Sequence, residues 1–224
     1  MMGIRRLVSV AMMGMTVWSF SSCDGILDGI YDDADDEGAT SITTDEESTR
    51  GSIYINITDY YSWIYFNVHD PKLDTLTIDL SLDNDEILAD EPEEWDLAFH
   101  RWDVRTNGGA ALETEYTSLD DLEASGEIPS GDYVEDEWYE YVSVDMSGMM
   151  SGEIGYMACY VNHELGKYMD VDTSGMPPSY TPSGKVYMVR FSDGTYMALI
   201  VSNYLNSSGV KGYLTIDYIY PYEV

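Results

Sequence analysis

The sequence predicts an all-β protein, built as a single domain of antiparallel sheets with at most one or two short helices. Apolar residues alternate with polar residues over several short runs, which is typical of half-buried strands. Turn signals that contain glycine separate these runs. No segment has the length of the crossover helix that a parallel sheet needs, so the strands are expected to be antiparallel.

The first 22 residues have the pattern of an export signal. Arg5 and Arg6 precede an apolar run at residues 7–20, and two serines then precede Cys23. The run is short for a membrane span and ends in small residues, which favours a cleaved signal over an anchor helix. A cysteine in this position is typical of a lipobox, where the acylated thiol becomes the first residue of the mature chain. Ordinary secretion with an incidental cysteine is the alternative.

Residues 23–50 are predicted to form an acidic flexible tether, because they are rich in Asp and Glu and show little periodicity. Removing residues 1–22 removes two arginines and no acid, which leaves 8 basic and 42 acidic residues and a net charge of −34. This charge excludes a nucleic-acid partner, since phosphate binding needs clustered Lys and Arg. We expect a lipid-anchored protein of the outer membrane, exposed at the cell surface, with the periplasmic face as the alternative.

The folded domain is predicted to span residues 51–224, and its first half reads as strands. Apolar side chains alternate along residues 53–57 and 76–82, which predicts two half-buried strands. Residues 95–99 read as a third strand, with Trp95, Leu97 and Phe99 on one face. A short run with Trp102 and Val104 follows, and Asn107-Gly108-Gly109 is expected to close it in a tight turn.

The last third of the chain is predicted to be a meander. Residues 185–191, 195–204 and 213–220 read as strands, and Ser-Asp-Gly and Ser-Ser-Gly turn signals separate them. One helical turn is expected where Ser118 and Asp121 have the spacing of a capping box. Cys159 lies in an apolar run and is expected to be a buried small hydrophobe rather than a reactive thiol.

The sequence offers little support for catalysis. The three histidines, His69, His100 and His163, lack the spacing of a zinc site, and no nucleophile elbow, P-loop or dinucleotide fingerprint occurs. A secreted hydrolase with paired carboxylates stays a rival class, but the sequence nominates no pair. An oxygen-rich stretch at residues 79–86 lacks the residue order of an EF-hand and is expected to be a solvated turn rather than a calcium site.

Two loops carry methionines in unusual surroundings. Met146, Met149 and Met150 lie in Met-Ser-Gly-Met-Met-Ser-Gly, where Gly and Ser interrupt any strand or helix pattern, and Met176 lies in Gly-Met-Pro-Pro. Thioethers on such loops suit the grip on a flat apolar ligand. Thioether sulfur is also a soft ligand that binds haem iron and favours its reduced state. A groove or partner surface that binds no haem is the alternative.

Several segments together resemble the HmuY-like family of haem-binding lipoproteins, the haemophores of Gram-negative anaerobes. They are EWDLAFHRWDVRTNGG at residues 94–109, PSGKVYMVRFSDGTYMALIVSNYLNSSGVKGYLTIDYIY at residues 182–220, the two Met loops and the lipoprotein-type N-terminus. The resemblance covers most of the chain after the tether. It implies that haem is held between two β lobes and that residues on two loops ligate the iron from both sides. These ligands are histidines in some members and methionines in others.

The resemblance implies that Met149 and Met176 are the axial ligands of the iron, with Met150 and Met146 as the fallbacks. Aromatic walls are expected from tyrosines beside the loops, because their rings offer flat faces with polar tips; these are Tyr156, Tyr168 and Tyr180. The few cations of this region are candidates to meet the haem propionates; these are Lys167, Lys185 and Arg190.

The predicted function is therefore that of a haem-binding lipoprotein and not of an enzyme. It captures haem (iron protoporphyrin IX) through paired axial methionines and delivers it to a TonB-dependent receptor of the outer membrane. The alternative is an adhesin-like surface lipoprotein that binds a glycan or a protein, with exposed Tyr and Trp side chains as stacking platforms.

Overall fold

The structure is a computed structural model that describes residues 40–44, 48–172, 174–175 and 179–224. All of them belong to one compact unit, Asp32–Val224. Every strand pairing in it is antiparallel, and two short α-helices accompany the strands, which confirms the predicted fold class. Within these ranges, no helix is long and apolar enough to cross a membrane.

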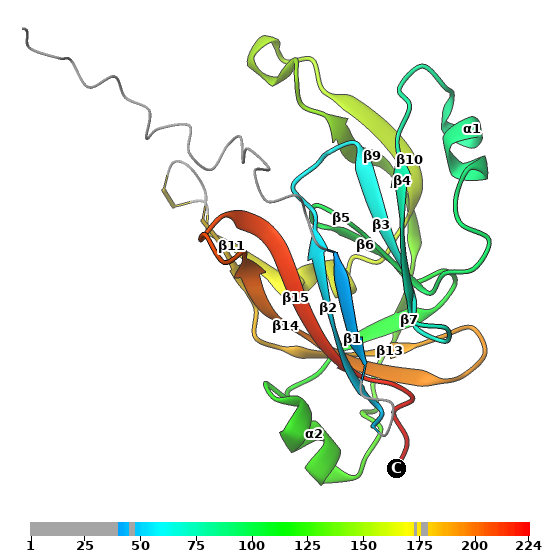
Figure 1. Cartoon of the computed structure of the whole chain (residues 1–224), viewed down its shortest axis with the longest axis vertical. Coiled ribbons are helices and arrows are strands. Elements are labelled where there is room, and N and C mark those ends of the chain that lie inside the picture. The colour runs from blue at the N-terminus through cyan, green and yellow to red at the C-terminus, as the bar shows by residue number, and fades with distance from the viewer. Residues whose placement is uncertain (1–39, 45–47, 173, 176–178) are drawn as a thin grey trace, which may run out of the picture. The chain divides into compact units, whose positions relative to one another are not determined.

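The largest sheet has seven strands in the order β1-β2-β15-β14-β13-β7-β8 (Figure 1). The last three strands of the chain lie side by side in it, which confirms the predicted meander. The bounds of its members are β1 (Ser41–Thr44), β2 (Arg50–Asn56), β7 (Ala110–Glu113), β8 (Val134–Glu135), β13 (Val186–Arg190), β14 (Tyr196–Leu205) and β15 (Lys211–Ile219).

Strand β1 lies inside the stretch expected to be a flexible tether. It pairs in register with β2, although three of its four side chains are exposed. Its place at the sheet edge therefore depends on backbone pairing and on the partly buried Ile42, which packs against the main core. A strand held in this way shows no apolar periodicity, so the sequence pattern did not reveal it.

A second sheet has four strands in the order β4-β3-β5-β6. Its members are β3 (Ser62–Asn67), β4 (Lys72–Thr77), β5 (Leu97–His100) and β6 (Asp103–Arg105). One of its faces packs on the seven-stranded sheet, as the shared cluster of Phe66, Phe99 and Ile55 shows. Its other face carries Trp63 and Ala98 and packs on a hairpin described below. Burial on both sides leaves all four residues of β5 inside the protein.

Trp95 does not share a face with Leu97 and Phe99, so that part of the strand prediction is wrong. Strand β5 begins at Leu97, and Trp95 lies before it. Its ring packs in the second cluster, edge-on to Tyr65 at 5.1 Å, whereas Leu97 and Phe99 belong to the main core. Alternation holds only inside a regular strand, so it could not be extended to this residue.

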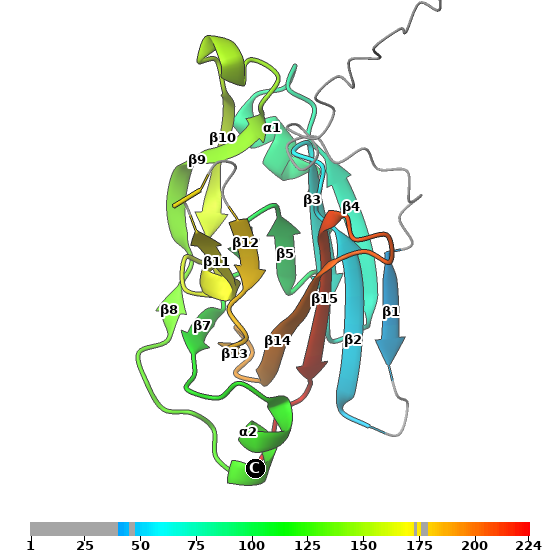
Figure 2. The ribbon, with the colours of Figure 1, turned by 90° about the vertical axis from the view of Figure 1, so that its left-hand side faces the viewer.

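Two hairpins complete the described β structure, and the strands of each pair with one another rather than with a strand of either sheet (Figure 2). Strands β9 (Glu137–Asp145) and β10 (Gly155–Val161) form the first, and β11 (Met169–Asp172) and β12 (Ser179–Pro182) form the second. Two 3-10 turns accompany them, one at Met149–Ser151 and one at Leu165–Tyr168.

Helix α2 (Leu119–Ser125) covers the outer face of the seven-stranded sheet. Ser118 is its N-cap, as predicted, although its hydroxyl accepts from the Asp120 amide at 3.2 Å rather than from residue 121. Leu119 and Leu122 are buried against Met188 and other side chains of the sheet. This packing closes the third apolar cluster.

The predicted strand at residues 76–82 is wrong in its second half. Strand β4 ends at Thr77, and Leu80 and Leu82 are 45% and 36% exposed. The Asp79 carboxylate accepts from the amide of Ser81 at 2.9 Å, which turns the chain there. A local side-chain bond of this kind competes with strand pairing, so the apolar alternation did not decide the structure.

Helix α1 (Asn84–Ala89) follows this turn, where the sequence suggested only a solvated turn. The Asp83 carboxylate accepts from the Glu86 amide at 3.0 Å, and the Glu86 carboxylate accepts from the Asp83 amide at 3.1 Å. This is a complete capping box. Asn84 then donates to the carbonyl of Ala158 and accepts from its amide, both at 2.8 Å, which ties the helix to strand β10.

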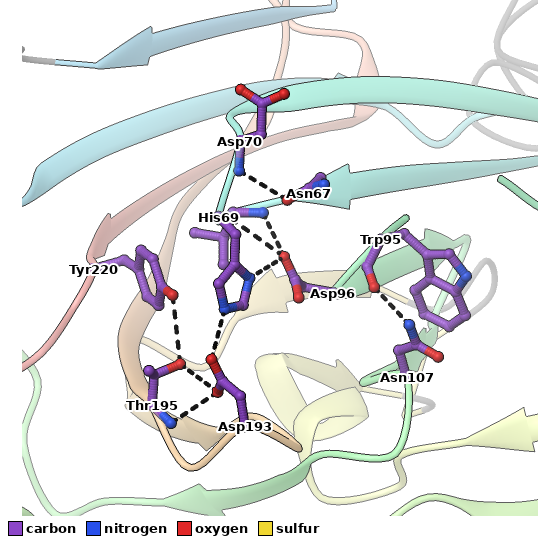
Figure 3. A network of polar contacts seen from close by, with 10 residues as sticks. Asn67, His69, Asp70, Trp95, Asp96, Asn107, Asp193, Thr195 and Tyr220 are labelled. Carbon is purple, nitrogen blue, oxygen red and sulfur yellow. Dashed lines mark hydrogen bonds and ion pairs between the residues drawn. The ribbon is translucent and has the colours of Figure 1, made fainter. Parts of the chain in front are cut away.

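The segment around Trp95 and Asp96 has the structural role that the sequence indicated. One oxygen of the Asp96 carboxylate accepts from the Val68 amide at 2.7 Å and lies 2.8 Å from Nδ1 of His69. Nε2 of His69 lies 3.1 Å from the carboxylate of Asp193 (Figure 3). The imidazole therefore connects the β3–β4 turn of one sheet with the β13–β14 turn of the other.

The predicted tight turn at Asn107-Gly108-Gly109 is also present. Asn107 and Gly108 have φ values of 47° and 79°, and the Gly109 amide donates to the carbonyl of Thr106 at 2.9 Å. The Asn107 side chain donates to the carbonyl of Trp95 at 2.6 Å, as Figure 3 shows. Asn tolerates a positive φ better than most residues, which explains its place here.

Candidate functional site

The two hairpins follow each other in the chain, and a short segment at residues 162–168 links them. In Figure 2 both hairpins lie on the side of the molecule away from β1 and β2. A cavity of about 280 Å³ lies at their junction, and its lining includes Trp102, Val161, His163, Lys167 and Met169. The roots of both hairpins therefore meet at one polar and aromatic depression.

The first hairpin ends in the predicted methionine loop. Its turn is closed by backbone bonds from the Met149 amide to Met146 and from the Glu153 amide to Gly148, both at 3.0 Å. Gly152 closes the 3-10 turn with a φ of 81°, where a side chain would be strained. The loop is thus a hydrogen-bonded turn with a defined backbone conformation.

This loop presents its methionines to the outside. Met149 is 40% exposed and Met150 is 90% exposed, whereas Met146 is half-buried. Apolar side chains of this size are seldom left open without a reason when they are grouped. Two methionines of the seven-stranded sheet, Met188 and Met197, are by contrast fully buried and belong to the core.

A polar contact at the root of the loop holds it to the four-stranded sheet. The Asp145 carboxylate accepts from the Ser147 amide and from the hydroxyl of Tyr61, both at 2.8 Å. The bonds from Ser147 and then the bond from Tyr61 keep the pKa of Asp145 below its ordinary value. The carboxylate therefore stays charged, and these bonds persist, well below neutral pH.

The second methionine, Met176, lies outside the described residues. It belongs to the connection between β11 and β12, whose last described pair is Asp172 and Ser179. The structure therefore does not test whether Met149 and Met176 approach each other. It describes the two strands from which the second loop extends.

The three predicted ring walls have different surroundings. Tyr156 is 49% exposed on β10 and lies edge-on to the exposed Tyr141 at 5.8 Å, so both rings are open to a ligand. Tyr180 is half-buried and stacks on Trp102, with ring centroids 4.3 Å apart and an interplanar angle of 4°. Tyr168 is not a wall, because it is buried and its hydroxyl donates to the carbonyl of Arg101 at 2.7 Å.

Sequence reasoning missed the role of Trp102. It predicted this residue only as part of a short strand, whereas the indole lines the junction cavity and contacts the second hairpin. Residues 102 and 180 are far apart in the chain, so no local pattern could join them. The sequence offered only general signals for this contact, namely the aromatic ring of Trp102 and the tyrosines that lie beside the Met loops.

The predicted cations are also separated by the fold. Lys167 lines the cavity and forms an ion pair with Glu164 at 2.6 Å. The cavity therefore offers one cation, and the carboxylate of Glu164 offsets part of its charge. Arg190 lies on β13 with its guanidinium 5.2 Å from the ring of Tyr133, outside the cavity lining. Lys185 precedes β13 and does not line the cavity either.

The described histidines and Cys159 show no arrangement typical of a metal site. In the part of the chain that the structure describes, no group of three His, Cys, Asp or Glu side chains could hold a metal ion. His100 is buried and bonds through Nε2 to the carbonyl of Tyr60 at 2.8 Å. Burial raises the pKa of Cys159 to about 12, which leaves its thiol unreactive.

Fold and site together define a class of protein. It is an antiparallel β protein in which two hairpins project from one junction, and the first hairpin offers soft sulfur and open aromatic rings. Such side chains suit a large, flat and mainly apolar ligand.

Comparison with known proteins identifies the family. The model of the family HmuY, described as HmuY protein, matches residues 59–218. The chain therefore belongs to the HmuY family. No curated protein sequence matches it at a significant level.

Solved structures agree with this assignment. A protein from Bacteroides vulgatus named as HmuY-like and heme-binding has 49% identity and a TM-score of 0.74, with 83% of this chain and 99% of that chain covered. A Bacteroides fragilis protein named as a lipoprotein has 44% identity and a TM-score of 0.73, with coverages of 81% and 95%. Apo PinO from Porphyromonas gingivitis has 29% identity and a TM-score of 0.64, with coverages of 80% and 100%.

Proposed function

We propose that this protein binds haem between its two hairpins and carries it as cargo, without a bond-making step. The axial ligands of the iron are Met149 on the first hairpin loop and Met176 on the second. Met150 and Met146 are the alternative ligands. The observation that carries the proposal is the pair of exposed thioethers, Met149 and Met150, on a closed loop. The haem-binding name of the relative at 49% identity supports it.

The donor set fits haem. Thioether sulfur is a soft, neutral ligand that haem iron accepts, and the exposed rings of Tyr141 and Tyr156 on the same hairpin offer apolar faces to the porphyrin. Tyr180 and Trp102 offer a second pair of rings at the other hairpin. Lys167 is the cation at the junction for a propionate, although Glu164 shares its charge.

The site of action follows from the N-terminus. Acylation of Cys23 would anchor the protein, and the lipoprotein name of the relative at 44% identity supports this. In our proposal the part of residues 23–50 that precedes β1 contributes the tether, and the folded part hands haem to a TonB-dependent receptor of the outer membrane at the cell surface. The rival function is an adhesin-like lipoprotein, for which the exposed Trp138 and Tyr160 on the first hairpin would be stacking platforms.

Haemin titration tests the proposal. The full chain, kept in detergent, is titrated in air and again after dithionite, as wild type and as the double variant Met149→Ala, Met176→Ala. We expect a saturable one-to-one low-spin spectrum that sharpens on reduction and is lost in the double variant. Met197→Leu, in the core, is the matched control and keeps the spectrum. Binding that persists in the double variant would refute these ligands, and a flat titration of the wild type would favour the adhesin-like rival.

The identity of the ligands can also be tested by pH. Methionine does not titrate near neutral pH, whereas free histidine gains a proton near pH 6.5. We therefore expect haem affinity at pH 5.5 to remain within about twofold of that at pH 7.5, with reduced haem held more tightly than oxidised haem. An equal and large loss of affinity in acid for both oxidation states would contradict methionine ligation.

A further inference from the structure

The turn between β5 and β6 has an unfavourable backbone conformation. His100 pairs with Asp103, so Arg101 and Trp102 form a two-residue turn. Arg101 has a φ of 48°, in the left-handed region that residues with a side chain disfavour. Residues in such conformations persist only where their surroundings fix them, and they cluster at functional sites.

Three sets of contacts fix Arg101 in this conformation. Its Nη1 donates to the carbonyls of Ile57 and Thr58 at 3.2 and 2.6 Å, in the connection that follows β2. Its guanidinium lies 4.3 Å from the centre of the Tyr60 ring. Its own carbonyl accepts from the buried Tyr168 hydroxyl at the root of the second hairpin. The turn is therefore tied to both sheets and to the segment that links the hairpins.

The strained turn places Trp102 against the second hairpin. The indole is half-buried, and it stacks on Tyr180 of β12 in nearly parallel planes. The Arg101 guanidinium lies 5.1 Å from its centre, and the ring of Tyr204 on β14 lies 6.1 Å away. A continuous series of ring and cation contacts thus runs from Tyr60 through Arg101 and Trp102 to Tyr180.

Such contacts matter for the second hairpin because most of its side chains are exposed, although Met169 of β11 is buried in the main core. The hairpin has two strands of four residues, and isolated two-stranded hairpins are marginally stable in water. Three of the four side chains of β11 are exposed, as are two of the four of β12. Tyr180 is one of the two β12 side chains that are half-buried.

We infer that Trp102 is a positioning residue for haem: it fixes β12 through Tyr180, and it thereby sets the distance between the two hairpins that grip the porphyrin. Arg101 supports it by holding the indole in place. The inference rests on the proposed haem function. It assigns to a turn outside both methionine loops a role in the affinity of the site.

The test compares Trp102→Ala and Trp102→Phe with Tyr133→Ala in the full chain. Tyr133 is the matched control, because its half-buried ring also contacts an arginine, Arg190, and a tyrosine, Tyr196, but packs against the third apolar cluster, which holds no residue of either hairpin. Amide hydrogen exchange of residues 169–172 and 179–182 is measured without haem, and haemin affinity and spin state are then measured by absorption. Thermal unfolding of each variant reports its general stability.

We expect Trp102→Ala to speed exchange in both strands, to weaken haemin binding about tenfold, which is ~1.4 kcal/mol, and to add a high-spin component. Trp102→Phe restores most of the affinity, and Tyr133→Ala changes neither readout even if it lowers the melting temperature as much. Unchanged affinity in Trp102→Ala overturns the inference and leaves the haem function intact. A wild type that binds no haemin overturns the haem function itself, and this inference with it.

Discussion

At the scale of single residues, His69 shows how one side chain can join two sheets. Its two ring nitrogens face carboxylates from different turns, Asp96 and Asp193, and the rings of Phe191 and Tyr220 flank it at 5.6 and 5.1 Å. Partial burial opposes protonation and is the largest single influence. The hydrogen bonds and charges of the two carboxylates together outweigh it, so the pKa of His69 is raised above its ordinary value.

This raised pKa makes the contribution of His69 to stability dependent on pH. A group whose pKa is raised in the folded state stabilises the protein fully below its unfolded pKa, near 6.5, and loses this effect as pH rises through the folded value. We therefore expect His69→Gln to lower the melting temperature by about 2–4 °C at pH 5.5 and by less at pH 9. Calorimetry at both pH values measures this, with the exposed His163→Gln as control. A larger loss at pH 9 would contradict the assignment.

At the scale of elements, the stability of helix α1 depends more on the hydrogen bonds of its first turn than on the burial of its side chains. Only Ile87 of its six residues is buried, whereas the capping box of Asp83 and Glu86 is complete. Removing an N-cap carboxylate costs about 1 kcal/mol. We therefore expect Asp83→Ala to lower the urea midpoint with an unchanged slope, and Asp85→Ala, which removes an acid of the first turn that does not cap, to have a smaller effect. Equal effects would indicate a loss of charge rather than of the cap.

The sequence predicted elements well where burial repeats regularly. The meander of β13, β14 and β15 and the helix after Ser118 were expected from apolar alternation, turn signals and a cap. The predicted strand at residues 76–82 was wrong in its second half, because the side chain of Asp79 bonds locally. That bond turns the chain, and helix α1 follows. The prediction also failed for Trp102, whose partner Tyr180 is joined to it only by the folded chain. Spacing within one segment carries no information on such a contact.

At the scale of the whole molecule, we propose that an acidic segment joins the folded part to a membrane. The N-terminal pattern predicts acylation of Cys23, and a strongly acidic stretch follows this residue. Stable anchoring needs two or more acyl chains, as mature lipoproteins would carry on this cysteine. In this proposal the anchor is a chemical modification and not a property of the β fold.

The anchor can be tested in cells. We expect Cys23→Ser to move the protein from the membrane fraction and the detergent phase into the aqueous phase, because the substituted hydroxyl cannot take the thioether-linked lipid. Cys159→Ala is the control, since that thiol is buried in the second cluster and should leave partitioning unchanged. Phase separation followed by detection of the protein measures both. A Cys23→Ser variant that stays in the detergent phase would refute lipid anchoring.

The bond between Asn84 and Ala158 has a consequence for crowded surfaces. A lipid anchor confines many copies to a plane, where an open strand edge is a template for pairing with a neighbour. The Asn84 amide fills both backbone positions of Ala158, as a neighbouring strand would, at 2.8 Å each. One side chain therefore occupies that stretch of the β10 edge, and we expect it to hinder strand pairing there between neighbouring copies.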